Sequence, residues 1–425
     1  MTADAGAGAG PRRLFALGVA ARSPEDDPEV AAYWAELGRL AESAGAEVAE
    51  RYVQVRSEPD PHTYVGPGVV ERTVQALAQA AEAGRPFDGV LLAHEVAPRV
   101  LARLGERLPV PVEDRTRLIL GVFARRARSA EGRLQVELAR LSYELPRLPG
   151  RRRGLSRQGG AVGMRGGAGE SALELDRRRI RARIAELRHR VALLRQERAA
   201  RRADRGEMPR VALVGYTNAG KTTLLGALAG RDEGGRDRLF DTLDPTVRRV
   251  RHPAFGQILA VDTVGFVRDL PPGLLEAFEA TLAEVREADL LVHVVDGTSP
   301  HAPAEVEAVR AVLSRIGADT VPEVLVATHV RRPEEVAARL PGALAVDSPA
   351  GVGLEAVCRR IGQTLAAMRP EVVLDLPPGR WDLVAFARAR GPVEVETAAD
   401  GRLRLSARLT PADAARLRRR ALGGG

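Results

Sequence analysis

Apolar residues in the first third of the chain form short runs that alternate with stretches of helical periodicity. The runs predict strands, and the stretches with apolar residues three and four positions apart predict helices. Strands are expected at residues 14–20, 47–56, 87–92 and 110–112, and helices at 28–44, 69–83 and 98–108. Alternation of strand and helix favours a largely parallel sheet. We therefore expect an N-terminal α/β domain over residues 12–125, after a flexible start at 1–11.

Two later segments carry apolar residues spaced alternately by four and three positions. They are Leu134, Leu138, Leu141, Leu145 and Leu148, and then Ile180, Ile184, Leu187, Val191 and Leu194. Each segment holds about two heptads, which suits a packed pair of helices better than a long coiled coil. We expect an antiparallel helical hairpin over residues 126–205, with a tip loop rich in Gly and Arg at 149–169.

The strand and helix alternation returns in the second half of the chain. Strands are expected at 211–214, 258–261, 290–295, 324–327 and 343–346, and helices at 221–229, 275–287, 304–316, 334–340 and 354–367. This predicts a second α/β domain over residues 206–370. In the small domain expected at 371–425, a hairpin joins 393–396 to 403–406, and Thr410 begins a helix. The fold class is therefore multidomain α/β, with a small α+β domain at the end.

Composition narrows the class of protein. The chain has 425 residues, of which only 4% are aromatic, so aliphatic packing must fill the cores. The sequence contains no run of about 18 apolar residues, so no membrane-spanning helix is predicted. Residues 1–10 lack the pattern of a secretory signal. A single cysteine, Cys358, excludes an internal disulfide framework. We expect a cytoplasmic protein, and a monomer.

Positive charge is concentrated in the predicted hairpin. The net charge is +8, yet residues 125–205 carry 23 arginines against nine acidic residues. The tip loop has no acidic residue and holds Arg151, Arg152, Arg153, Arg157 and Arg165. A concentrated positive field is typical of a polyanion partner. The alternatives are a solvated arginine surface and a disordered linker.

One lysine occurs in the whole chain. Lys221 lies in the run Gly215-Tyr216-Thr217-Asn218-Ala219-Gly220-Lys221-Thr222, which fits the P-loop pattern completely, follows a predicted strand and opens a predicted helix. Backbone N–H groups of such a loop face phosphates, the lysine reaches the β- and γ-phosphates, and the Thr222 hydroxyl can bind Mg²⁺. The second α/β domain is therefore expected to be a P-loop domain.

Two further stretches suit nucleotide chemistry. Asp262-Thr263-Val264-Gly265 follows a predicted strand about 40 residues on, where Asp262 suits the Mg²⁺ side and Gly265 the γ-phosphate. Between the two motifs lies Leu239-Phe240-Asp241-Thr242-Leu243-Asp244-Pro245-Thr246. A threonine there can give Mg²⁺ a second hydroxyl. Spacing alone leaves Thr242 and Thr246 as alternatives.

Over nearly its whole length the sequence resembles HflX-type GTPases. The resemblance is carried by residues 59–68 (PDPHTYVGPG), 114–116 (DRT), 132–139, 155–160 (LSRQGG), 169–170, 176–180, the P-loop, 242–246 (TLDPT) and 262–266 (DTVGF). It implies a GTP- and Mg²⁺-dependent factor that binds the large ribosomal subunit and splits ribosomes, stalled ones included. It also implies that the hairpin tip approaches the peptidyl transferase centre. Some relatives are linked to antibiotic resistance, and some bind ATP through the N-terminal domain.

The resemblance also assigns roles to single residues. It makes Thr242 the Mg²⁺ ligand, beside Thr222, and likens Asn218 to an asparagine that supports K⁺ in related enzymes. Phe266 occupies the place where many GTPases carry a water-orienting glutamine. Because a hydrophobic side chain cannot orient water, slow turnover stimulated by large subunits is expected.

The chain departs from the family at the guanine-specificity motif N-K-x-D. Thr328-His329-Val330-Arg331 stands there, and the later S-A motif reads Ser348-Pro349-Ala350. Arg331 has only donors and cannot accept from the guanine base. Base selection is therefore expected to be relaxed to GTP and ATP or lost, unless a local shift lets nearby groups recover guanine contacts.

Three functional hypotheses follow. The first is an HflX-like GTPase that splits or rescues ribosomes, for which a specialised role such as antibiotic protection is one form. The second is a ribosome-binding factor with a degenerate nucleotide domain. The third, an RNA-remodelling ATPase acting through the N-terminal domain, lacks a second P-loop motif. His94 has no metal-site spacing, whereas His293 and Cys358 suit packed positions.

Overall fold

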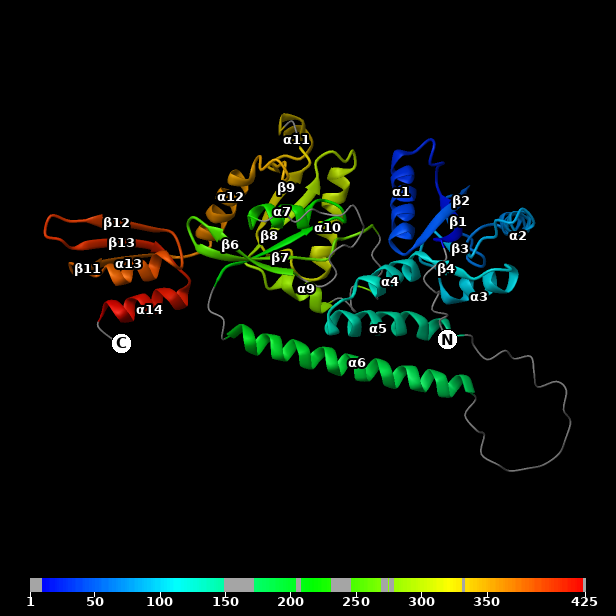
Figure 1. Ribbon diagram of the computed structural model, residues 1–425, viewed down its shortest axis with the longest axis horizontal. Helices are drawn as coiled ribbons and strands as arrows, with labels where there is room; N and C mark the ends of the chain where they lie inside the picture. The colour runs from blue at the N-terminus through cyan, green and yellow to red at the C-terminus, as the bar shows by residue number, and fades with distance from the viewer. Residues whose placement is uncertain are drawn as a thin grey trace, which may run out of the picture. The chain divides into compact units, whose positions relative to one another are not determined.

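The computed structural model describes residues 10–148, 172–203, 208–230, 246–268, 274, 279–330 and 333–422 (Figure 1). The chain divides into two compact units. The first comprises Met1–Arg195 with Asp269–Phe278, and the second Gln196–Arg268 with Glu279–Gly425. The expected fold class, multidomain α/β with a parallel N-terminal sheet, a helical region and a P-loop domain, is confirmed.

A four-stranded parallel sheet forms the core of the first unit. Its strands are β1 (Arg12–Ala20), β2 (Ala46–Val55), β3 (Gly89–Leu92) and β4 (Val112–Asp114), in the order β2-β1-β3-β4. Helices α1 (Pro28–Ser43), α2 (Pro67–Glu82) and α3 (Pro98–Arg107) connect them. The last strand begins two residues later than expected. Pro111 has no N–H to donate, although its carbonyl accepts from Val90 at 2.8 Å.

Helix α4 (Arg115–Arg126) was not expected from the sequence. Asp114 caps it, because its carboxylate accepts a hydrogen bond from the backbone N–H of Arg117 at 3.0 Å. Helices α5 (Ala130–Glu144) and α6 (Ala172–Ala203) follow, with a short 3₁₀ turn at Leu145–Arg147. Leu138, Ile184 and Leu187 pack together between α5 and α6. The expected helical pair is therefore present, while its tip lies outside the described residues.

The side chain of Asp114 joins the hairpin to the sheet. It is fully buried and accepts from the Tyr143 hydroxyl at 2.6 Å and from Arg147 Nη2 at 3.4 Å. Burial, together with the Asp114 carboxylate, raises the pKa of Tyr143 well above its ordinary value. The Arg147 guanidinium stacks on the Tyr143 ring at 3.5 Å. The first hairpin helix is thus fixed at the carboxyl edge of the N-terminal sheet.

A six-stranded sheet forms the centre of the second unit. Its strands, in spatial order, are β10 (Leu344–Ala345), β9 (Glu323–Thr328), β8 (Leu290–Asp296), β5 (Arg210–Gly215), β7 (Gly256–Asp262) and β6 (Thr246–His252). All pairs are parallel except β6 with β7. Strand β6 was not expected, because its arginines and edge position obscure the apolar alternation. The described helices are α7 (Lys221–Leu228), α9 (Glu279–Arg286), α10 (Ala302–Arg315), α11 (Pro333–Arg339) and α12 (Leu354–Ala367).

The end of the chain forms a three-stranded antiparallel sheet covered by two helices. Strands β11 (Glu371–Leu376), β12 (Val393–Thr397) and β13 (Leu403–Arg408) lie in the order β11-β13-β12. Helices α13 (Trp381–Arg388) and α14 (Pro411–Ala421) lie on one face of this sheet (Figure 1). Strand β11 and helix α13 were not anticipated. No described helix combines the length and apolar character that a bilayer crossing needs.

Candidate nucleotide-binding site

The loop between β5 and α7 folds closely against the neighbouring strand β8. Gly215 has φ 148°, and a Cβ at this position would lie 2.0 Å from the carbonyl oxygen of Val294. Asn218 and Gly220 have positive φ angles of 62° and 82°. Such turns in front of a helix N-terminus gather backbone N–H groups, which is the arrangement that binds phosphate. The residues expected to form a P-loop, 215–222, therefore have the backbone that this role requires.

Lys221 is buried at the start of α7. Its ammonium donates to the carbonyl oxygens of Gly215 at 3.1 Å and of Tyr216 at 2.7 Å. Burial lowers the pKa of Lys221 to about 8, although the nearby Asp262 carboxylate acts in the opposite direction. An ammonium has three donors, so one remains for a phosphate oxygen. The carbonyl contacts aim the only lysine of the chain into the loop.

A second wall of the site comes from the end of β7. The Thr222 hydroxyl donates to Asp262 Oδ2 at 2.7 Å, which joins the first turn of α7 to β7. A Cβ on Gly265 would lie 2.7 Å from Thr217 Cγ2 and 3.1 Å from Lys221 Nζ. Only glycine fits so close to the lysine. The structure thus brings Lys221, Thr222, Asp262 and Gly265 together around one cradle.

The segment after Gly265 is hydrogen-bonded to the loop. Phe266 donates its N–H to Gly215 O at 3.0 Å and accepts from the N–H of Thr217 at 2.8 Å. The Phe266 side chain is buried. Thr263 is buried as well, and its hydroxyl donates to Leu213 O at 2.6 Å. Two backbone hydrogen bonds therefore hold the chain after β7 against the phosphate loop.

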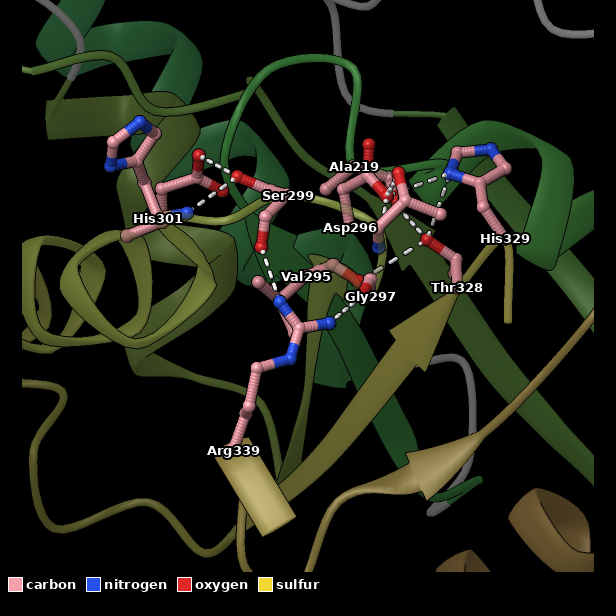
Figure 2. Close-up of polar contacts among 11 residues, drawn as sticks. Ala219, Val295, Asp296, Gly297, Ser299, His301, Thr328, His329 and Arg339 are labelled. Carbon is pink, nitrogen blue, oxygen red and sulfur yellow. Dashed lines mark hydrogen bonds and ion pairs between the residues drawn. The ribbon is translucent and has the colours of Figure 1, made fainter. Parts of the chain in front are cut away.

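The end of β9 approaches the same loop from the other side. The Thr328 hydroxyl donates to Ala219 O at 2.7 Å and lies 3.2 Å from Val295 O (Figure 2). This side chain is almost completely buried. The threonine in the place of the expected asparagine thus bridges three segments, but its single proton is used in doing so.

His329 has an unusual backbone conformation for a residue with a side chain. Its φ is 58°, and its Nδ1 lies 3.4 Å from Asp296 Oδ1 (Figure 2). Burial alone would raise the pKa of Asp296, but hydrogen bonds from His329 and Thr298 outweigh it and hold the pKa below its ordinary value. Strained backbone of this kind is concentrated at functional sites. The imidazole is therefore held beside the phosphate loop.

A guanidinium supports the loop that follows β8. Arg339 of α11 donates to the carbonyl oxygens of Gly297 at 2.5 Å and Ser299 at 3.0 Å (Figure 2). The Ser299 hydroxyl donates to Glu305 at 2.9 Å, and burial raises the pKa of this carboxyl group. Sequence reasoning missed both Asp296 and Arg339. Asp296 ends an apolar strand at the carboxyl edge, a recognisable signal, whereas Arg339 is one of many arginines.

The second expected specificity segment lies beside β9. Val346 N donates to Ala327 O at 2.8 Å, which holds the start of the 346–350 segment in place. Ser348 is buried, and its hydroxyl has no hydrogen-bond partner among the described residues. Pro349 and Ala350 are exposed. The structure thus brings Thr328, His329, Val330 and Ser348 to one end of the sheet.

Several expected site residues lie outside the described part of the chain. They are Phe240, Asp241, Thr242, Leu243, Asp244 and Arg331, and the tip arginines Arg151, Arg152, Arg153, Arg157 and Arg165. Their roles remain predictions. His293, by contrast, is buried and lies 3.1 Å from Glu323, as expected of a packed residue.

Comparison with known proteins identifies the family. Residues 31–124 match the family described as GTP-binding GTPase N-terminal, residues 126–205 the GTP-binding GTPase middle region, and residues 210–329 the 50S ribosome-binding GTPase. A GTP-binding protein from Sulfolobus solfataricus, solved with GDP, covers 84% of this chain and 99% of its own at 22% identity, with a TM-score of 0.42.

Two curated relatives are similar over most of the chain. GTPase HflX of Caldanaerobacter subterraneus is 40% identical over 373 residues, which cover 87% of this chain and 85% of the relative. GTPase HflX of Escherichia coli K12 is 36% identical over 352 residues, which cover 81% of each. Because each relative is more than a third identical to this chain over an alignment that covers more than four fifths of both sequences, the chain belongs to the HflX family of GTPases.

Proposed function

We propose that this protein is a GTPase that binds the large ribosomal subunit and dissociates ribosomes, including stalled ones, in a nucleotide-dependent way. The observation that carries the proposal is the cradle formed by Lys221, Thr222, Asp262 and Gly265. The family membership and the match of residues 210–329 to 50S ribosome-binding GTPases support it.

The cradle suits a nucleotide polyphosphate. The loop that precedes α7 and the N-terminus of α7 supply fixed positive potential, although the N–H groups of Thr217 and Ala219 are used within the protein. Lys221 adds a full charge where burial keeps water away. Because Gly265 leaves room that a Cβ would fill, the terminal phosphate can approach the lysine closely.

Residues present in the cradle also suit Mg²⁺. The ion usually takes one or two protein oxygens together with phosphate oxygens, and the Thr222 hydroxyl and the Asp262 carboxylate lie 2.7 Å apart. Thr242 is the further ligand that we propose. When bound, the ion would neutralise charge on the phosphates.

The segment at the end of β7, which forms the second wall of the site, can couple the state of the nucleotide to the ribosome. A γ-phosphate that accepts from the N–H of Gly265 pulls on a segment whose next residue, Phe266, is hydrogen-bonded to the loop. Loss of that phosphate releases the segment. The buried Phe266 cannot orient a water molecule, so we propose that the subunit, or K⁺ held near Asn218, stimulates hydrolysis.

The hairpin is the proposed ribosomal contact. Arg181, Arg188 and Arg190 are exposed along α6, and the arginines of the tip loop continue the charge in the sequence. Guanidinium groups at this density suit the phosphates of rRNA.

Light scattering of intact ribosomes tests the proposal. Wild-type protein with GTP and Mg²⁺ should lower the scattering as subunits separate, and Lys221→Ala should not. Arg359→Ala is a matched control, because Arg359 is an exposed cation paired with Glu355 on α12. Equal splitting rates for wild type and Lys221→Ala would count decisively against the proposal.

A second candidate function is supported by the part of the site where the nucleotide base is expected to bind, at the end of β9. Thr328 uses its only proton on backbone carbonyls, and Arg331, by its chemistry, cannot accept from guanine. We propose as the alternative a ribosome-binding factor of relaxed base specificity, for which ATP serves as well as GTP.

Competition binding separates the two candidates. Under relaxed specificity, GDP, ADP and XDP should bind within about tenfold of each other, and Thr328→Asn with Arg331→Asp should restore a preference for GDP. A wild-type preference for GDP over ADP above about a hundredfold would exclude the alternative.

A further inference from the structure

Charge in the last 55 residues is separated between two layers of the structure. Helices α13 and α14, with the loops beside them, carry seven arginines against two aspartates. The three strands and their connections carry three arginines against five acidic residues. Both helices lie on one face of the sheet (Figure 1). This face is therefore strongly cationic, and the strand layer is slightly acidic.

Side chains along the seam between the helices form a continuous row. Arg390 pairs with Asp413 at 3.1 Å and stacks on the Phe386 ring at 3.9 Å. Arg420 lies 4.6 Å from the centre of the same ring. Arg380 donates to Arg420 O at 3.2 Å. Arg390 also donates to Phe386 O at 3.0 Å, so its N–H groups serve to hold the two helices together. The Arg420 guanidinium, which lies over the same ring, can present its N–H edge to a phosphate.

Three further arginines of the helices have no partner. Arg388, Arg418 and Arg419 are exposed, and none has an ion pair or side-chain hydrogen bond within the described part of the chain. Among exposed charges, those with no internal partner contribute most freely to binding a polyanion. Trp381 stands next to Arg380 and is 52% exposed, although large aromatic side chains are rare in this chain.

We propose that the α13–α14 face is an RNA-binding surface, separate from the helical hairpin. Its arginines contact the phosphate backbone, and Trp381 stacks on an unpaired base. RNA fits better than an acidic peptide because only a nucleic acid offers both closely spaced phosphates and flat aromatic rings. The surface extends the proposed function but does not depend on the nucleotide site.

Salt dependence of RNA binding tests the charge part of the proposal. The full chain is titrated into a fluorescein-labelled RNA hairpin with an unpaired loop, at several salt concentrations. A variant with Arg388→Gln, Arg418→Gln and Arg419→Gln should lower the slope of log affinity against log salt by about 2. The control variant Arg359→Gln, Arg402→Gln, Arg404→Gln removes the same charge from other exposed positions and should change the slope by less than about half as much.

Three outcomes would overturn the proposal. One is an unchanged slope in the first variant, and another is an equal loss in the control. The third is displacement of RNA by poly-glutamate at equal charge concentration, which would mean that the face recognises charge alone.

Tryptophan fluorescence tests the stacking part. The chain has two tryptophans, and Trp34 is buried. RNA should therefore quench the emission of Trp381, and Trp381→Leu should abolish the quenching. Quenching of equal size in Trp381→Leu would contradict the stacking.

Discussion

At the scale of single residues, the site depends on side chains whose hydrogen-bonding capacity is nearly used up. Lys221 donates twice to its own loop, and Thr328 gives its one proton to Ala219 O, with Val295 O also within reach at 3.2 Å. Such side chains fix geometry before a ligand arrives, and this lowers the entropy lost on binding. Titration of Lys221, and replacement of either side chain, should therefore change the site directly.

Nucleotide affinity should fall as the pH rises above about 8. The pKa of Lys221 in the free protein is lowered to about 8, whereas a bound polyphosphate favours the charged form and raises this pKa. Binding must then take up a proton above pH 8 and weaken by up to about tenfold per pH unit. Calorimetric titration of GDP with Mg²⁺, in two buffers of different ionisation enthalpy, measures both effects. Constant affinity from about pH 8 to about pH 9, with no proton uptake, would refute the assignment.

Thr328→Val should destabilise the site without changing its shape. The substitution leaves the buried carbonyl of Ala219 without the hydroxyl that donates to it. A loss of about 1–3 kcal/mol in the free energy of unfolding is expected, measured by urea denaturation. Thr364→Val is the control, because Thr364 is only half-buried and its hydroxyl bonds only to its own helix. A change of similar size in both variants would argue against the role of Thr328.

At the scale of elements, alternation and periodicity predicted most strands and helices of both α/β sheets. The exceptions have physical causes. Strand β6 lies at a sheet edge and carries arginines on its exposed side, so it shows little apolar alternation. Asp114 is both the last residue of β4 and the N-cap of α4, so the strand and the helix join without a loop. Local pattern cannot show such a junction.

The junction at Asp114 makes a prediction about the hairpin. Tyr143→Phe removes one hydrogen bond to a buried carboxylate, which should cost about 1.5–3 kcal/mol of unfolding free energy. The first unit should lose this stability, and hydrogen exchange in α5 should become faster. Tyr52→Phe is the control, because Tyr52 bonds only to the exposed Arg72. Unchanged exchange in α5 would show that Asp114 does not anchor the hairpin.

The candidate site was only partly predictable, because local sequence pattern does not show which distant elements meet in the fold. The phosphate end follows from a contiguous motif, and Lys221, Thr222, Asp262 and Gly265 come together as expected. The base end is assembled from β8, β9 and α11, which are distant in sequence. Asp296 could have been suspected from its place at the end of an apolar strand, but Arg339 could be placed there only with the fold known.

At the scale of the whole molecule, the account links a phosphate cradle to cationic surfaces. Arginine is concentrated in the hairpin and on the α13–α14 face, while the only lysine lies in the cradle. Arginine suits many phosphates of an RNA surface, and the compact ammonium suits one polyphosphate. A protein built in this way should bind rRNA more or less tightly according to the nucleotide it holds.

The affinity for large ribosomal subunits in each nucleotide state tests this claim most directly. Fluorescently labelled protein is titrated with purified 50S subunits in the presence of Mg²⁺ and either GDP or a non-hydrolysable GTP analogue. The account predicts at least about tenfold tighter binding with the analogue, and no such difference for Lys221→Ala. Equal affinity of the wild-type protein in both states would contradict it.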